Sequence, residues 1–78
     1  MYKDSRIEII NNILTMAKNH GDYIGDDLII EEHKISFSSN NFNIAFLINS
    51  LRAKHIKVTE YTIEALNNRW LKFDFELN

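Results

Sequence analysis

The sequence has no cysteine and no proline, and only two glycines in 78 residues. Without cysteine, neither a disulfide nor a thiolate metal site can support the fold, and a reducing cytoplasm is the expected compartment. Two glycines are too few for a glycine-rich phosphate loop. The longest apolar run is "IAFLI" at 44–48, far too short to span a bilayer, and the N-terminus has charges where a signal peptide would be apolar. We therefore expect a cytoplasmic protein with no membrane contact.

The chain carries 9 basic and 11 acidic residues, 45% hydrophobic residues and 12% aromatic residues. This composition is typical of a globular protein, and the length fits a single domain over 1–78 with a thin core. A net charge of −2 disfavours sequence-independent coating of nucleic acid. The second half of the chain, 39–78, carries five basic and four acidic residues, so a local basic patch is expected there.

Two segments are predicted to be helical. Over 5–19, Ser5 and Glu8 have the spacing of a capping box, an apolar stripe follows at helical period, and Gly21 provides a stop. The second helix follows the cap-forming cluster "SSNN" and covers "FNIAFLINSLRAKH" at 42–55. It is apolar on two sides, which is typical of a central helix.

Two further segments have the composition of strands. "LIIEEHKISF" at 28–37 fits either one bulged strand or two short arms that meet at "EEHK". Over 71–77, apolar and charged residues alternate, which predicts a half-buried strand. We expect this last strand to pair with the one around Ile35 and to leave its other side as a free sheet edge. Such an edge can pair with a second copy, so a homodimer is possible.

"VTEYTIEALNNR" at 58–69 has two interpretations. As a helix it begins at Thr59, and Val58 and Ile63 have the spacing of a hydrophobic staple. As a strand it alternates and ends in a turn at Asn67 and Asn68. The helix is preferred because the turn lacks glycine, and the resulting order is helix, strand, helix, helix, strand.

Residues 51–63, "LRAKHIKVTEYTI", resemble the corresponding run of winged helix-turn-helix DNA-binding domains of the arginine repressor type. The matched positions are Leu51, Ile56, Val58, Thr59, Thr62 and Ile63. The resemblance implies an α+β, winged-helix-like fold with a small antiparallel sheet, and a reading helix that starts near Thr59. Glu64 and Ala65 stand where the family has a DNA-contacting Ser-Arg pair, and His55 stands where it has a turn glycine.

The leading hypothesis is a non-enzymatic regulator of transcription that binds DNA through a helix-turn-helix at about 44–69. Its candidate contacts are Arg52, Lys54, Lys57, Thr59, Tyr61, Thr62, Asn67, Asn68 and Arg69.

The alternative is an inhibitor or adaptor of the kind that phages and plasmids encode, which would bind a protein partner. It would use the acidic loop 22–32 or an aromatic face, with candidate residues Asp22, Asp26, Asp27, Glu31, Glu32, Phe42 and Phe46. His20, His33 and His55 lack metal-ligand spacing, and no nucleophile is indicated, so we expect no enzyme, cofactor or metal.

Overall fold

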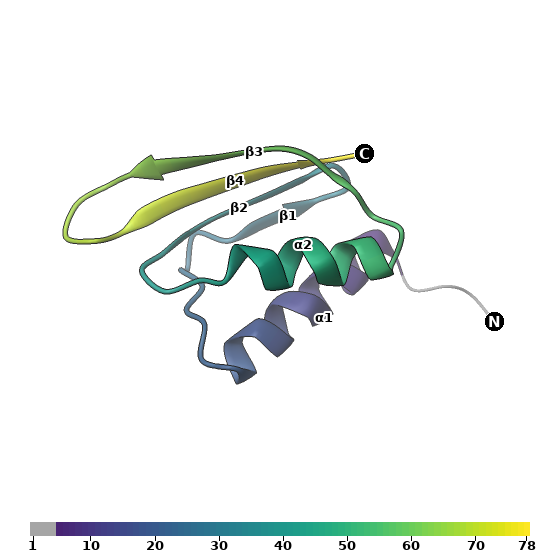
Figure 1. The fold of residues 1–78 in the computed structure, drawn as a ribbon, viewed down its shortest axis with the longest axis horizontal. Helices are drawn as coiled ribbons and strands as arrows, with labels where there is room; N and C mark the ends of the chain where they lie inside the picture. The colour runs from purple at the N-terminus through teal and green to yellow at the C-terminus, as the bar shows by residue number, and fades with distance from the viewer. Residues whose placement is uncertain (1–4) are drawn as a thin grey trace.

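A computed structural model describes residues 5–78. The elements are α1 (Arg6–Asn19), β1 (Ile29–Glu31), β2 (Lys34–Ser39), α2 (Ile44–Ala53), β3 (Val58–Ala65) and β4 (Leu71–Leu77). The four strands form one antiparallel sheet in the order β1-β2-β4-β3. Both helices lie on one side of the sheet and leave its other face open (Figure 1). The α+β class is confirmed, and no helix within the described residues is long and apolar enough to cross a membrane.

Helix α1 begins and ends as its sequence predicts. The Ser5 hydroxyl accepts the Glu8 backbone N–H at 3.1 Å, and Gly21 has φ +102°, the left-handed conformation that glycine adopts without strain. The predicted apolar stripe is buried: Ile10, Ile13, Leu14 and Ala17.

Helix α2 begins later than predicted. Its cap is Asn43, whose side chain accepts the Phe46 N–H at 3.2 Å, rather than a residue of "SSNN". It ends at Ala53, and His55 lies beyond it with φ +64°. The Ile56 N–H then returns to the Leu51 carbonyl at 2.9 Å, so His55 occupies the left-handed position that a glycine commonly takes after a helix.

The segment 28–37 forms the two short arms rather than one bulged strand. Strands β1 and β2 pair with Ile30 opposite Ile35, and Glu31 and Lys34 flank the turn. Arg6 of α1 links this turn to the end of the chain. Its guanidinium donates hydrogen bonds to the Glu32 carbonyl at 2.9 Å and to the Asn78 carbonyl.

Residues 59–69 form no helix, and the predicted helix over this segment is wrong. Val58–Ala65 is strand β3, and the order of elements is α-β-β-α-β-β. The β-branched and aromatic residues of this segment suit a strand, and the spacing of Val58 and Ile63 misled the helix prediction. The turn closes without glycine because Asn68 and Arg69 both adopt positive φ, at 51° and 71°.

The predicted free edge at 71–77 is also wrong, although the strand itself and its pairing with β2 are confirmed. Strand β4 lies inside the sheet between β2 and β3, with Phe73 opposite Phe37 on one side and Ile63 on the other. Phe37, Phe73 and Phe75 are buried against both helices and form the centre of the core. The free edges are therefore β1 and β3.

Candidate interaction surface

Strand β3 is the most exposed regular element in the described part of the chain. All of its residues except Val58 are exposed. Tyr61 is 49% exposed and Ile63 45% exposed, although both are large and apolar. β3 is an edge strand of the sheet, and Figure 1 shows that the tip of the β3–β4 hairpin extends past the N-terminal end of α2.

The backbone of β3 has one set of hydrogen-bonding groups with no strand beside it. The Leu66 N–H donates to the Trp70 carbonyl at 2.9 Å, which closes the hairpin. In an antiparallel pair, hydrogen-bonded positions alternate along the strand, so Glu64 and Thr62 follow Leu66 in bonding to β4. The N–H and C=O groups of Tyr61, Ile63 and Ala65 consequently point away from β4.

The two faces of β3 differ in chemistry. Tyr61 and Ile63 lie opposite Phe75 and Phe73, so their side chains share the helix-covered side of the sheet. The Tyr61 ring packs on Phe75 with the centroids 6.1 Å apart. Strand alternation places Glu60, Thr62 and Glu64 on the open side.

The open face of the sheet is acidic. The residues that alternation places on it from β1, β2, β3 and β4 include Glu31, Glu60, Glu64, Asp74 and Glu76, with Lys34 and Lys72 as the only cations among them. Glu60 lies directly opposite Glu76, an arrangement of like charges that destabilises a sheet.

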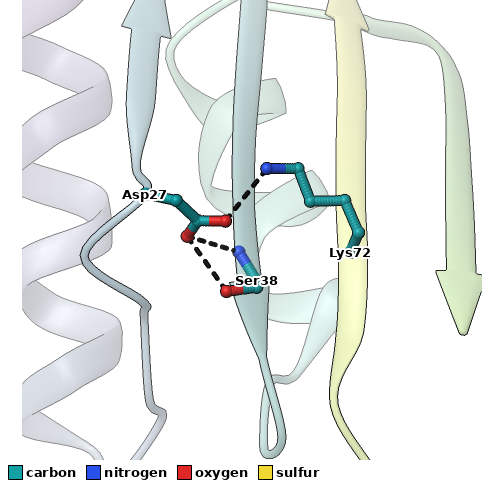
Figure 2. A network of polar contacts seen from close by, with 3 residues as sticks. All are labelled: Asp27, Ser38 and Lys72. Atoms are coloured by element: carbon teal, nitrogen blue, oxygen red, sulfur yellow. Dashed lines mark hydrogen bonds and ion pairs between the residues drawn. The ribbon is translucent and has the colours of Figure 1, made fainter. Parts of the chain in front are cut away.

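Asp27 organises one corner of this face (Figure 2). Its carboxylate accepts the Ser38 backbone N–H at 2.9 Å and the Ser38 hydroxyl at 3.0 Å, and it forms an ion pair with Lys72 at 3.0 Å. The Ser38 backbone hydrogen bond, followed by that from Lys72, lowers the pKa of Asp27 from 3.8 to about 2. These contacts hold the segment before β1 against β2 and β4.

The predicted DNA-contacting residues do not form one surface. Arg52 and Lys57 line a surface cavity of about 300 Å³ with His55 and the apolar residues Ile48, Ile56 and Val58, and Lys54 lies in the same α2–β3 connection. Thr59, Tyr61 and Thr62 lie on β3, where the Thr59 hydroxyl donates to the Glu76 carbonyl at 3.2 Å. Asn67, Asn68 and Arg69 form the hairpin turn. Arg52, Lys54 and Lys57 are therefore separated from Arg69 by an extended strand of eight residues, about 25 Å long.

The acidic loop is likewise divided. Asp22 accepts the Asn43 N–H at 3.3 Å at the start of α2, and Asp27 forms the network in Figure 2. Glu31 and Glu32 lie at the β1–β2 turn, whereas Asp26 is exposed before β1. Two of the five carboxylates therefore have structural partners, and the five do not form one patch.

Phe42 and Phe46 are both half-buried and pack against the core. Phe42 packs edge-on against Phe37, with ring centroids 4.8 Å apart, and against Phe73 at 5.5 Å. Phe46 is half-buried beside His20, with ring centroids 6.0 Å apart. Phe42 thus contributes to the core packing while it keeps part of its surface exposed.

Within residues 5–78, no three histidine or acidic side chains come together as a metal site. Comparisons with protein-family models, curated proteins and solved structures find no match. The winged-helix resemblance therefore still depends on residues 51–63 alone.

Sequence reasoning missed the role of Ile63, Ala65, Glu60 and Glu64 as an exposed edge. The signal in the sequence is the alternation of apolar and polar residues over 58–65, on which the strand interpretation of this segment depends. Strand order was the missing information, because alternation does not reveal which strand lies at the edge of a sheet.

Proposed function

We propose that the chain is a non-enzymatic protein-interaction module that binds an extended segment of a partner chain along β3. The observation that carries the proposal is the exposure of β3, whose outward N–H and C=O groups are unpaired over Tyr61, Ile63 and Ala65. In strand addition, main-chain hydrogen bonds supply affinity and alternating side chains supply specificity. An exposed strand of eight residues suits that form of binding.

The charges on β3 favour a particular partner. An added strand would place alternate side chains beside Tyr61 and Ile63 on the helix side, and beside Glu60 and Glu64 on the open side. Apolar residues suit the first set and lysine or arginine suits the second. The proposed ligand is thus an extended segment in which apolar and basic residues alternate.

DNA binding stays a prediction from the sequence, but it cannot use the expected helix-turn-helix, because residues 58–65 form a strand. The segment expected to read the major groove is β3, which presents two glutamates. The cations among the predicted DNA contacts lie at opposite ends of that strand. Arg52, Lys54 and Lys57 precede it, and Arg69 follows it. A protein-binding role requires neither a reading helix nor a continuous basic surface.

The test is a selection of nine-residue peptides from a random display library, followed by amide hydrogen exchange on the complex. The experiment uses a concentration at which light scattering shows the chain to be monomeric. We expect selected peptides to alternate apolar and basic residues and to slow exchange at the Tyr61, Ile63 and Ala65 amides. The amides of Thr62 and Glu64 should be protected even without peptide, because they bond to β4.

The matched control is the variant Glu60→Gln/Glu64→Gln, which removes the charges and keeps the strand. It should lose the preference for basic residues while retaining binding to alternating apolar peptides. Protection that maps instead to the cavity at Arg52 and Lys57, or to Phe46, would contradict the proposal. If DNA instead changes amide exchange around Arg52 and Lys57, and if its binding weakens steeply as salt rises, the result would favour the DNA hypothesis.

A further inference from the structure

We infer that the strand added to β3 is β3 of a second copy, which pairs antiparallel about a twofold axis at Ile63. The inference rests on the strand addition proposed above and names a second copy as the partner at the same edge. That copy supplies the apolar side of the proposed ligand but carries glutamates instead of basic residues, so its register must keep the glutamates apart. A twofold interface brings the same surface of both copies together, so the strand must be complementary to itself. Three features of β3 meet that condition in one register.

The first feature is the direction of the backbone groups. Only Tyr61, Ile63 and Ala65 face outward, so these must form the hydrogen-bonded pairs of the new ladder. With Ile63 opposite Ile63 of the second copy, Tyr61 lies opposite Ala65 of the second copy, and the reverse pair follows by symmetry. Each such pair exchanges two hydrogen bonds, which gives about six across the interface.

The second feature is charge. In the Ile63-centred register, Glu64 lies opposite Thr62 of the second copy, and no two glutamates face each other. A register centred on Thr62 would place Glu60 opposite Glu64 twice. A register centred on Glu64 would place that residue opposite itself, and like charges directly opposite destabilise an antiparallel pair.

The third feature is regularity and size. The ladder between β3 and β4 is irregular between Val58 and Glu60, and a register centred on Tyr61 would bring this irregularity into the interface. The Ile63-centred register uses only the regular part of the strand. It also places the large Tyr61 side chain beside the small Ala65, and Ile63 beside its own copy, so the exposed apolar residues of both copies form one stripe.

The pairing would join two four-stranded sheets into one of eight strands. Its open face would carry the glutamates of both copies in one continuous acidic surface. The opposite edge does not offer the same arrangement, because β1 has only three residues. Self-pairing through β3 therefore gives a closed dimer rather than a filament.

Cysteine cross-linking tests the register directly, because the native chain has no cysteine. Ile63→Cys places the two new thiols on the twofold axis, where hydrogen-bonded residues have Cα atoms about 5.5 Å apart, within the range of a disulfide. Oxidation should convert it to a covalent dimer. The matched control is Thr62→Cys, which lies opposite Glu64 of the second copy and should form no covalent dimer on oxidation; the reverse result would overturn the register.

Light scattering on the wild-type chain, over a hundredfold range of concentration, should show a dimer at the upper end. Ile63→Pro removes an outward N–H and leaves the bonds to β4 intact, so it should give a monomer with an unchanged far-ultraviolet circular dichroism spectrum. Should that variant not fold, Ile63→Lys provides the same test through its charge. A dimer that survives a folded Ile63→Pro would overturn the inference.

The two proposals fail in different ways. A wild-type chain that is monomeric at every concentration but binds an alternating peptide at Tyr61, Ile63 and Ala65 would refute self-pairing and keep strand addition. A monomer that binds no peptide there would refute both.

Discussion

The two hairpins of the sheet differ in how far their outer sides are covered by other parts of the chain. In the first hairpin, β1 has three residues, and the segment before it covers the outer side of β2: the Gly25 N–H donates to the Ser38 carbonyl at 2.8 Å, and Asp27 accepts the Ser38 N–H. In the second hairpin, β3 has eight residues and nothing beside its outward groups within the described chain. Each hairpin contributes one buried strand, β2 or β4, to the centre.

The contrast indicates that the exposed edge is not a by-product of small size. The chain satisfies the backbone of β2 with a loop and a side chain, so the means of covering an edge are present. On β3 the only protective features are two glutamates and the irregularity at its start, and both are devices that proteins use to discourage unwanted pairing. An edge that is restricted but left open suits a selective partner.

The largest expected effect separates the two strands of the second hairpin. Phe75→Ala should lower the free energy of unfolding by about 3–5 kcal/mol, because the ring is fully buried in the core. Tyr61→Ala, at the position directly opposite on β3, should cost less than about 1.5 kcal/mol, because half of that side chain is already exposed. Urea unfolding of the two variants at low concentration measures the difference, and equal losses would show that β3 contributes to the core as much as β4 does.

A second variant tests the covered edge of the first hairpin. A Cβ atom at Gly25 would lie 2.8 Å from the Ser38 carbonyl oxygen and 2.7 Å from its hydroxyl. Gly25→Ala should therefore cost about 1–3 kcal/mol, because the segment must move away from β2. Gly21→Ala serves as a control: its Cβ would meet no atom within 4 Å, so any loss there reflects the positive φ alone. Thermal unfolding compares the two, and a larger loss at Gly21 would argue against close packing at Gly25.

The charge network in Figure 2 gives the first hairpin a dependence on pH. The folded-state pKa of Asp27, about 2, lies below the ordinary value of 3.8. The ionised carboxylate therefore stabilises the fold above pH 3.8, and this contribution is lost as the pH falls through 2. The full shift corresponds to about 2.5 kcal/mol, but the side chain is 42% exposed, and screening by water reduces the expected contribution to about 1 kcal/mol.

Asp27→Asn should remove that contribution at neutral pH and flatten the loss of stability between pH 4 and 2. Asp26→Asn makes the same change of charge one residue away at an exposed position, and should alter stability by less than about 0.5 kcal/mol. Urea unfolding at pH 7 and at pH 2.5 checks both variants. An equal effect at the two positions would assign the result to net charge rather than to the contacts with Ser38 and Lys72.

The sequence predicts the fold best where local patterns suffice. Helix α1, its cap at Ser5 and strand β4 follow from spacing and alternation, and the expected pairing of β4 with the strand around Ile35 is also confirmed. Sequence reasoning fails where the outcome depends on distant contacts: residues 58–65 become a strand because they pair with β4, with a single irregularity between Val58 and Glu60. The edge at β3 could not be predicted for the same reason, since strand order belongs to the assembled sheet.

The smallest expected effect on folding falls on the residue most important for the proposed contacts. Ile63→Thr keeps a β-branched side chain, and 45% of the original side chain is exposed, so the free energy of unfolding at low concentration should change by about 0.5 kcal/mol or less. Self-association should nevertheless weaken, because Ile63 lies on the twofold axis, and sedimentation velocity at high concentration measures this. Ile7→Thr is a control on α1, where an apolar residue of similar exposure, 39%, is replaced in the same way far from β3. A loss of association with Ile7→Thr alone would show that the interface lies on the helices. A loss with Ile63→Thr at unchanged stability would show that β3 remains exposed in the folded monomer because it serves binding.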